Sequence, residues 1–292
     1  MRIMHVHAHF DDYEFVAAGT FETWRRKLGE ELRARVVICT DGKAGHHART
    51  REETGWVRAA EQEASAKIGQ YEVERLRYHD GSVPREACLQ VTSNLLAALW
   101  KSIREFEPDY LFCPPLPTDT LAGIHNDHVT VADAVRRVAY MINVPHAFTP
   151  EYPVNETISA PCRVPVIVNV YDGYMIGETA FDLAIDVEDV MPAVCEMSWA
   201  HQSQVKEWLP WVGRHGLRAP ASPDEWSLLL RDRVNRRNKV LGINTNHATE
   251  VLTITAWGTV PSYDQVMRDI PNILPDASHL DKLRERLKRW QA

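Results

Sequence analysis

The chain has 292 residues, of which 45% are hydrophobic and 25% charged, and its formal net charge is -7. This composition is typical of a folded globular protein and excludes a disordered chain. The acidic balance argues against nucleic-acid binding along the whole chain, because such binding needs concentrated Lys and Arg. No apolar run approaches the roughly 20 residues of a membrane span. We therefore expect neither a nucleic acid nor a membrane as a partner.

The cysteines and the N-terminus indicate a reducing compartment. The five cysteines are scattered without a C-x-x-C pair, which is typical of reduced and mostly buried thiols. Histidines and aspartates occupy the N-terminal stretch, where a secretory signal would have an unbroken apolar segment. We predict a cytoplasmic protein.

Strand and helix patterns alternate along the first half of the chain, which is typical of a parallel sheet covered by helices. Short apolar runs predict strands at residues 3–8, 35–40, 73–78 and 110–113. Apolar residues at helical spacing predict helices at 16–32, 57–68 and 91–106, with Gly69 as a C-cap, and a further helix from His125. The pattern therefore predicts an α/β fold with a mostly parallel sheet flanked by helices.

The pattern is less regular beyond Pro145. Apolar runs predict strands at 164–171, 181–187 and 251–256, and helical spacing predicts helices at 190–208, 225–241 and from Leu280. Residues 210–226 are rich in Pro and Gly, which predicts a loop. We expect residues 1–205 to form the α/β catalytic domain and residues 206–292 to be an extension packed on the same domain.

Candidate metal ligands follow two of the predicted strands. His9, Asp11 and Asp12 come directly after the first strand, and the sequence H-N-D-H at residues 125–128 comes after the fourth. Right-handed crossovers place the carboxyl ends of parallel strands along one edge of a sheet. We therefore expect both clusters to meet around one divalent metal ion.

The residue types indicate hydrolytic chemistry. Zinc and similar ions accept histidine nitrogen and carboxylate oxygen, and a catalytic site commonly has three protein ligands and an open position. His9 and a carboxylate of the aspartate pair supply two, and His128 is the best candidate for the third. We expect Asp11 to be the general base that takes a proton from the attacking water. An imidazolium at His125 could stabilise the oxyanion or protonate the leaving amine, and Asp127 could orient either neighbouring histidine.

These residues resemble the motifs of the PIG-L/LmbE-like zinc-dependent N-deacetylases, which include the GlcNAc-PI de-N-acetylases. The family motif A-H-P-D-D-E is similar to A-H-F-D-D-Y at residues 8–13, and H-P-D-H is similar to H-N-D-H at 125–128. The resemblance covers roughly residues 1–205, and the remainder only loosely. It implies a Rossmann-like fold and removal of an N-acetyl group from an N-acetylglucosamine-type conjugate, a small-molecule partner.

The resemblance also implies a role for each matching residue. His9, Asp12 and His128 would hold Zn²⁺ or another divalent metal, with Asp11 as the base and His125 as the electrophilic partner. Two further residues, Arg58 and Asp80, fall where the family contacts substrate. Phe10, Tyr13 and Asn126 depart from the motifs; none of them removes a proposed ligand, but each could reshape the pocket.

Several alternatives stay open. The enzyme could be an amidase that removes a larger acyl group, or the chain could be a metal-containing binding protein without turnover. The basic runs 231–239 and 282–289 offer a nucleic-acid-binding role, although the second has the pattern of a solvated helix face. His5 and His7 could extend the metal site, but packed histidines are commoner in a strand. Trp199, Trp208, Trp211, Trp226 and Trp257 could stack on a sugar, and a homo-oligomer is possible.

Overall fold

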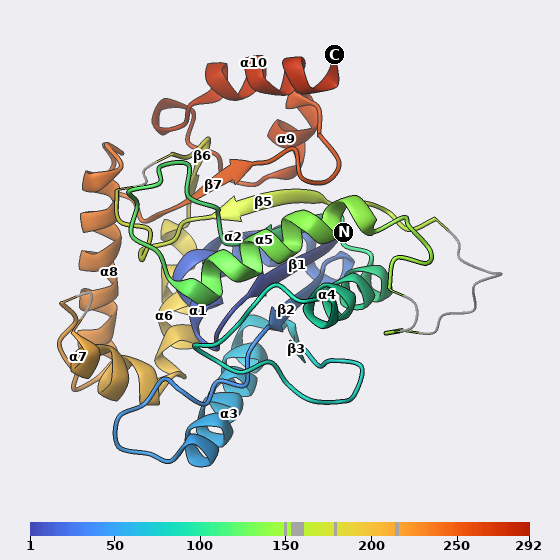
Figure 1. Ribbon diagram of the computed structural model, residues 1–292. Helices are drawn as coiled ribbons and strands as arrows, with labels where there is room; N and C mark the ends of the chain where they lie inside the picture. The colour runs from blue at the N-terminus through green and yellow to red at the C-terminus, as the bar shows by residue number, and fades with distance from the viewer. Residues whose placement is uncertain (149–150, 153–160, 178–179, 214–215) are drawn as a thin grey trace.

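The computed structural model describes residues 1–148, 151–152, 161–177, 180–213 and 216–292. Their strands form one sheet in the order β3-β2-β1-β4-β5-β7-β6 (Figure 1). The strands are β1 (Arg2–His7), β2 (Arg33–Ile38), β3 (Glu72–Arg75), β4 (Tyr110–Cys113), β5 (Val166–Val170), β6 (Leu183–Asp186) and β7 (Thr249–Ile254). The five strands from β3 to β5 pair in parallel, and β7 is antiparallel to both its neighbours. The predicted α/β fold with a mostly parallel sheet is confirmed.

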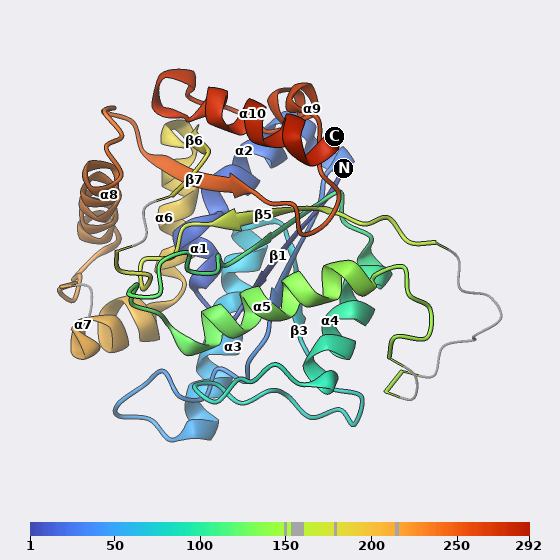
Figure 2. The ribbon, with the colours of Figure 1, turned by 45° about the horizontal axis from the view of Figure 1, so that its top comes forward.

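Helices cover both faces of this sheet. They are α1 (Asp12–Val16), α2 (Ala18–Leu28), α3 (Arg51–Gly69), α4 (Ser93–Phe106), α5 (Asn126–Met141), α6 (Met191–Trp199), α7 (Leu209–Val212), α8 (Pro223–Val240), α9 (Tyr263–Asp269) and α10 (Leu280–Gln291). Helices α4 and α5 pack on one face, and α1, α2 and α6 pack on the other (Figure 2). Among the described residues, no helix is long and apolar enough to cross a membrane.

Local chemistry fixes the ends of two helices of the first half. Thr50 and Glu53 form a reciprocal capping box at the start of α3, and Thr92 accepts a hydrogen bond from the backbone of Leu95 at the start of α4. Helix α3 ends one residue later than predicted, because Gln70, at φ 53°, takes the left-handed C-cap position expected for Gly69.

The prediction of one continuous helix at 16–32 is wrong. Ala17 has φ -143° and separates α1 from α2. The new helix begins there because the carboxylate of Glu250, on β7, accepts hydrogen bonds from the backbone N–H groups of Gly19 and Thr20, both at 2.8 Å. A partner 231 residues away in the sequence supplies these bonds, so no local pattern indicates the break.

One prediction in the second half also needs correction. The helix expected at 190–208 is interrupted after α6 and continues as a π-helix, η3 (Ser203–Trp208). Helix α9 was not predicted. The remaining irregular elements are the 3-10 turns η1 (Gly29–Glu31), η2 (Glu188–Val190) and η4 (Pro275–Ala277).

The C-terminal residues take part in the central sheet. β7 lies between β5 and β6 and pairs with both. Segments on either side of residue 205 therefore share one sheet and one hydrophobic core. The division of the chain at that residue stays a prediction.

The sheet order places the predicted site. The chain proceeds from β1 to β2 on one side of β1, whereas β4 lies on the other side. Ligands of open α/β sheets bind where the strand order reverses in this way, beyond the carboxyl ends of the strands. The residues after β1 and β4 are therefore at the expected position for a site.

Candidate active site

His9, Asp12 and His128 come together at this edge of the sheet. His9 Nδ1 and His128 Nε2 are 3.2 Å apart. One oxygen of Asp12 lies 3.2 Å from His9 Nδ1, and the other lies 3.4 Å from His128 Nε2. Two ring nitrogens that face each other beside a carboxylate can share a proton or bind one cation. This donor set of nitrogen and oxygen fits zinc.

The donor cluster is larger than the three predicted ligands. Donor atoms within 4.8 Å of one another form two groups, His9 with His125 and His128, and His7 with Asp12 and His128. His128 belongs to both. The predicted set takes His9 from the first group and Asp12 from the second, so this choice among five residues stays a prediction.

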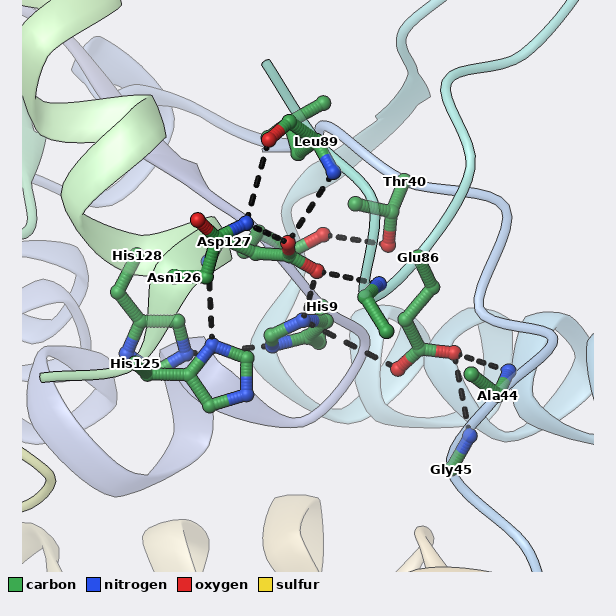
Figure 3. A network of polar contacts seen from close by, with 12 residues as sticks. His9, Thr40, Ala44, Gly45, Glu86, Leu89, His125, Asn126, Asp127 and His128 are labelled. Atoms are coloured by element: carbon green, nitrogen blue, oxygen red, sulfur yellow. Dashed lines mark hydrogen bonds and ion pairs between the residues drawn. The ribbon is translucent and has the colours of Figure 1, made fainter.

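Carboxylates hold the outer nitrogens of the two facing rings. His9 Nε2 lies 3.1 Å from Asp127 Oδ2 (Figure 3), and His128 Nδ1 lies 3.0 Å from Asp172 Oδ2. Such partners fix the tautomer and orientation of metal-binding histidines. They direct the lone pairs of His9 Nδ1 and His128 Nε2 toward each other.

The structure changes the partner expected for Asp127. We expected it to orient His125 or His128, but its carboxylate contacts His9. The residue that orients His128 is Asp172, which the sequence analysis missed. Asp172 lies just beyond the end of β5, at the edge where the other site residues lie. The rule that strand ends converge could have found it.

Asp127 is a buried anion with several donors. Its carboxylate accepts a hydrogen bond from the backbone of Ala87 at 2.7 Å. It also accepts one from the side chain of Asn126 at 3.0 Å (Figure 3). Burial alone would raise its pKa, but the contact with His9 and these donors lower the pKa well below its usual range. Asn126, which replaces the proline of the family motif, thus stabilises the carboxylate that holds His9.

Asp11 is held beside the donor cluster by Arg58. It has φ 84°, a left-handed conformation that is uncommon for a residue with a side chain. Arg58 Nη2 lies 3.2 Å from Asp11 Oδ1 and donates to the carbonyl of Phe10 at 2.8 Å. The backbone N–H of Asp11 donates to Gln62 Oε1 at 3.2 Å. These bonds fix the carboxylate at a strained backbone position.

Glu86 completes the surroundings of Arg58. Its carboxylate accepts from Arg58 Nη1 at 2.7 Å. It also accepts from the backbone of Gly45 at 3.2 Å (Figure 3). Burial favours the neutral acid, but Arg58, His9 and the backbone N–H of Ala44 outweigh it and lower the pKa of Glu86 to about 2. Arg58 is therefore paired with two carboxylates.

The electrostatics separate the two aspartates. Burial raises the pKa of Asp11 to about 7, although Arg58 opposes the rise; the charge of Asp12 adds to it. Burial also favours protonation of Asp12, but His7, His128 and His9 outweigh it and hold the pKa of Asp12 well below its usual range. Asp12 thus carries a negative charge, whereas Asp11 can exchange a proton near neutral pH.

His125 is a neutral imidazole. Burial lowers its pKa to about 4, and the neighbouring His128 and His9 contribute. The imidazolium expected from the sequence is therefore disfavoured at neutral pH. His125 Nδ1 accepts the backbone N–H of Asp127 at 3.3 Å, as the N-cap of α5. This bond assigns the ring proton to Nε2, which leaves Nε2–H as a donor.

A cavity of about 320 Å³ contains the cluster. Its lining includes all but two of the predicted site residues, together with side chains that were not predicted; the lining residues include His9, Asp11, Asp12, Arg58, His125, His128, Tyr174, Gln204, Trp208 and Arg233. Asp127 supports His9 from outside the lining. Asp80 also lies outside: it is exposed, and its carboxylate accepts from Ser82 Oγ at 2.6 Å. The structure does not bring Asp80 to the site.

Phe10 packs beneath a loop of the site. Its ring is fully buried, and a Cβ added at Gly42 would lie 2.3 Å from a ring carbon. Gly42 also has φ +64°, so both its conformation and the close approach require glycine. Phe10, which replaces the motif's proline, thereby seats the loop whose backbone at Gly45 binds Glu86.

The upstream histidines have different surroundings. His5 is fully buried against the rings of Tyr13 and Phe21, with centroids 5.3 and 6.3 Å away, so it is a packed core residue. His7 differs, because its Nδ1 lies 2.5 Å from Asp12 Oδ2. Of the five tryptophans considered, Trp208 lines the cavity and stacks on the exposed Trp211, with centroids 5.3 Å apart.

The first half of the chain matches a known family. Residues 4–139 fit the family model described as PIG-L, GlcNAc-PI de-N-acetylase. The matched segment is similar to a PIG-L domain. The segment contains His9, Asp11, Asp12 and His128, so the family inferred from the motifs is confirmed. No curated protein sequence matches the chain.

Solved structures share the fold over most of the chain. The N,N'-diacetylchitobiose deacetylase from Pyrococcus horikoshii is 18% identical with a TM-score of 0.64, over 92% of this chain and 86% of that one. GalB, the 4-carboxy-2-hydroxymuconate hydratase from Pseudomonas putida KT2440, is 16% identical with a TM-score of 0.55, over 86% and 95%. A zinc-inhibited form of the teicoplanin deacetylase Orf2 is 11% identical with a TM-score of 0.51, over 88% and 99%. At these identities the likeness shows the fold alone.

Proposed function

We propose that the chain is a zinc-dependent N-deacetylase that removes the acetyl group from an N-acetylglucosamine-type conjugate. The observation that carries the proposal is the facing pair His9 Nδ1 and His128 Nε2, 3.2 Å apart beside Asp12, with Asp11 held next to them by Arg58. This cluster belongs to the segment that is similar to a PIG-L domain. A structural neighbour is named for deacetylation of N,N'-diacetylchitobiose, an acetylated amino sugar.

His9, Asp12 and His128 would hold the metal, for which zinc fits the nitrogen and oxygen donors best among common divalent ions. When bound, zinc would polarise the amide carbonyl and make a water molecule more acidic. Asp127 and Asp172 keep the two histidine rings in the tautomer that presents His9 Nδ1 and His128 Nε2.

Asp11 would act as the base. Its carboxylate takes a proton from the attacking water and later delivers it to the nitrogen of the leaving amine. Arg58 fixes the position of this carboxylate through its contact with Oδ1. Asp11 lines the same cavity as His9, Asp12 and His128, so the proposed base and the proposed metal ligands face one space.

His125 would stabilise the charge that develops on the amide oxygen. Its Nδ1 accepts a backbone hydrogen bond, so Nε2–H is available to donate. A preorganised donor strengthens its hydrogen bond as the oxygen becomes negative. The role requires the neutral ring, in place of the imidazolium expected from the sequence.

Two rival functions remain to be compared with deacetylation: removal of a larger acyl group, and metal-dependent binding without turnover. The cavity of about 320 Å³ is at the lower end of ligand pockets, which favours a compact acyl group on one sugar ring. The proposed partner is a small molecule, whereas a cytoplasmic location and a homo-oligomer stay predictions.

The test measures zinc content by elemental analysis and amine release from N-acetylglucosamine, N,N'-diacetylchitobiose and their N-butyryl analogues. We expect about one zinc per chain and release from the acetylated compounds. Faster release from the butyryl analogues would favour the larger-acyl amidase. A protein that holds zinc but releases no amine would contradict the deacetylase proposal.

A further inference from the structure

Arg233 lies in the wall of the active-site cavity. It comes from α8, which runs beside α6 at one side of the molecule (Figure 1). The side chain is half-buried and lines both the 320 Å³ cavity and a neighbouring cavity of about 210 Å³. The two cavities also share Phe15 and Tyr171. Arg233 therefore lies where the active-site cavity adjoins a second space.

Arg233 differs from the other arginine in this cavity. Arg58 is paired with Asp11 and Glu86. In the part of the chain that the structure describes, no carboxylate lies within ion-pair distance of Arg233, and no hydrogen-bond acceptor is found for its guanidinium. Its N–H donors are thus available to a ligand.

A stacking contact orients this guanidinium. Arg233 Cζ lies 4.7 Å from the centre of the Phe15 ring, and that ring packs against the buried Trp226. Stacking on an aromatic face leaves the edge of the guanidinium free, and this edge fits a carboxylate or phosphate. Phe15 belongs to α1, which begins at Asp12, so one short helix connects the stacking ring to the donor cluster.

The charge of Arg233 is poorly compensated. Burial lowers its pKa, and Tyr174, Tyr171 and Asp11 only partly oppose this effect. Asp11 is already bound to Arg58. A partly desolvated cation without a counter-ion is unfavourable, and an anionic ligand would remove that cost.

Neighbouring arginines on α8 extend the basic surface. Arg236 and Arg237 line the 210 Å³ cavity with Arg233. Arg236 forms an ion pair with Asp232 at 2.7 Å, and Arg237 donates to the carbonyl of Thr249. Both therefore have acceptors, which leaves Arg233 as the member of this row with its donors available.

We propose that Arg233 determines specificity by binding an anionic group, a carboxylate or a phosphate, on the substrate of the proposed deacetylase. A neutral acetylated sugar could reach the donor cluster but would leave Arg233 without a hydrogen-bond acceptor. This inference rests on the proposed function, which supplies the acetylated sugar as substrate. The anionic group on that substrate is inferred separately, from the position of Arg233 in the cavity wall.

The test measures the binding affinity of a variant without turnover, so that anion binding is assessed separately from catalysis. Zinc-loaded protein carrying Asp11→Asn, with and without Arg233→Met, is titrated by calorimetry with neutral N-acetylglucosamine and with anionic probes. The probes are N-acetylglucosamine 1-phosphate, N-acetylglucosamine 6-phosphate and N-acetylmuramic acid, which place phosphate or carboxylate at different positions. Amine release by the wild type is measured separately, so the absence of catalysis does not affect this readout.

With Arg233 present, we expect at least one anionic probe to bind more tightly than the neutral sugar. Arg233→Met should weaken that probe by about 10- to 100-fold, which corresponds to losing charge-assisted hydrogen bonds, and leave the neutral sugar nearly unchanged. Arg233→Lys should restore part of the affinity, because it keeps the charge but not the planar fork. A preference for phosphate or carboxylate among the probes identifies the group.

Arg236→Met is the matched control, because Arg236 is exposed on the same helix and paired with Asp232. We expect this variant to bind all probes as before. If Arg233→Met lost affinity equally for the neutral and the anionic probes, Arg233 would only support packing, and the proposal would be overturned. Anionic probes that never bind more tightly than the neutral sugar would also overturn it.

Discussion

His9 Nδ1 and His128 Nε2 are 3.2 Å apart, although 119 positions separate the residues in the chain. Strands β1 and β4 are neighbours in the sheet, so the segments that follow them meet at its edge. The carboxylates of Asp127 and Asp172 contact the outer nitrogens of the two histidine rings. The two inner nitrogens are therefore directed at one position, which makes the metal proposal testable residue by residue.

Removing His128 should abolish metal binding. It belongs to both groups of donor atoms, so His128→Ala leaves neither group complete. We expect zinc content after dialysis to fall from about one per chain to a trace. His47→Ala is the control, because His47 is exposed and belongs to neither donor group. Unchanged zinc in His128→Ala would contradict the ligand assignment.

Replacing Asp172 should weaken the metal site without removing a proposed ligand. Its carboxylate holds His128 Nδ1 at 3.0 Å, and losing such a partner typically costs about 10- to 100-fold in metal affinity. We expect that loss in Asp172→Asn, measured by competition with a zinc chelator. Asp133→Asn is the control, because Asp133 lies on α5 and pairs with Arg137. If both variants bind zinc like the wild type, Asp172 does not act through His128.

Asp11 should be needed for turnover but not for the metal. Asp11→Asn keeps the size of the side chain and removes the base, so we expect zinc to stay bound and kcat to fall by about 100-fold or more. Zinc content and amine release are measured on the same preparation. A variant with full activity would disprove the role of base, whereas loss of zinc would make Asp11 a ligand.

Much of the site followed from short-range sequence features. Apolar runs located β1 and β4, and the rule that parallel strands end at one edge brought His9 and His128 together. The prediction that Asp80 contacts substrate rested on a match of only two residues. Its carboxylate instead accepts hydrogen bonds from Ser82 in a local turn. Arg233 could not be found, because a basic residue on a helix gives no sign of facing a cavity.

The parts of the fold that the sequence did not indicate depend on distant contacts. β7 was predicted as a strand, but its antiparallel place between β5 and β6 depends on pairing across the chain. The break at Ala17 depends on Glu250, and the break after α6 leads into a π-helix that brings Gln204 to the cavity. Such irregular helices are frequent at functional sites and have no simple periodic pattern.

A chain that ends at residue 205 should not fold stably. Without β7, β6 loses its only strand partner among the described residues, and β5 becomes an open edge. We expect the truncated chain to aggregate or to lack a cooperative thermal transition, measured by circular dichroism. The full chain, expressed in parallel, is the control. A truncated chain with a sharp transition would instead support an independent domain at 1–205.

Glu250 should stabilise the fold by completing the start of α2. Its buried carboxylate accepts from the backbone of Gly19 and Thr20 and from the Thr20 hydroxyl at 2.6 Å. Glu250→Ala leaves these buried donors without an acceptor, so we expect the free energy of unfolding to fall by about 2 to 4 kcal/mol. Urea denaturation followed by tryptophan fluorescence measures the change. Glu196→Ala, at an exposed position on α6, is the control and should change stability by less than about 0.5 kcal/mol. Equal stability of the two variants would show that this carboxylate does not stabilise the start of α2.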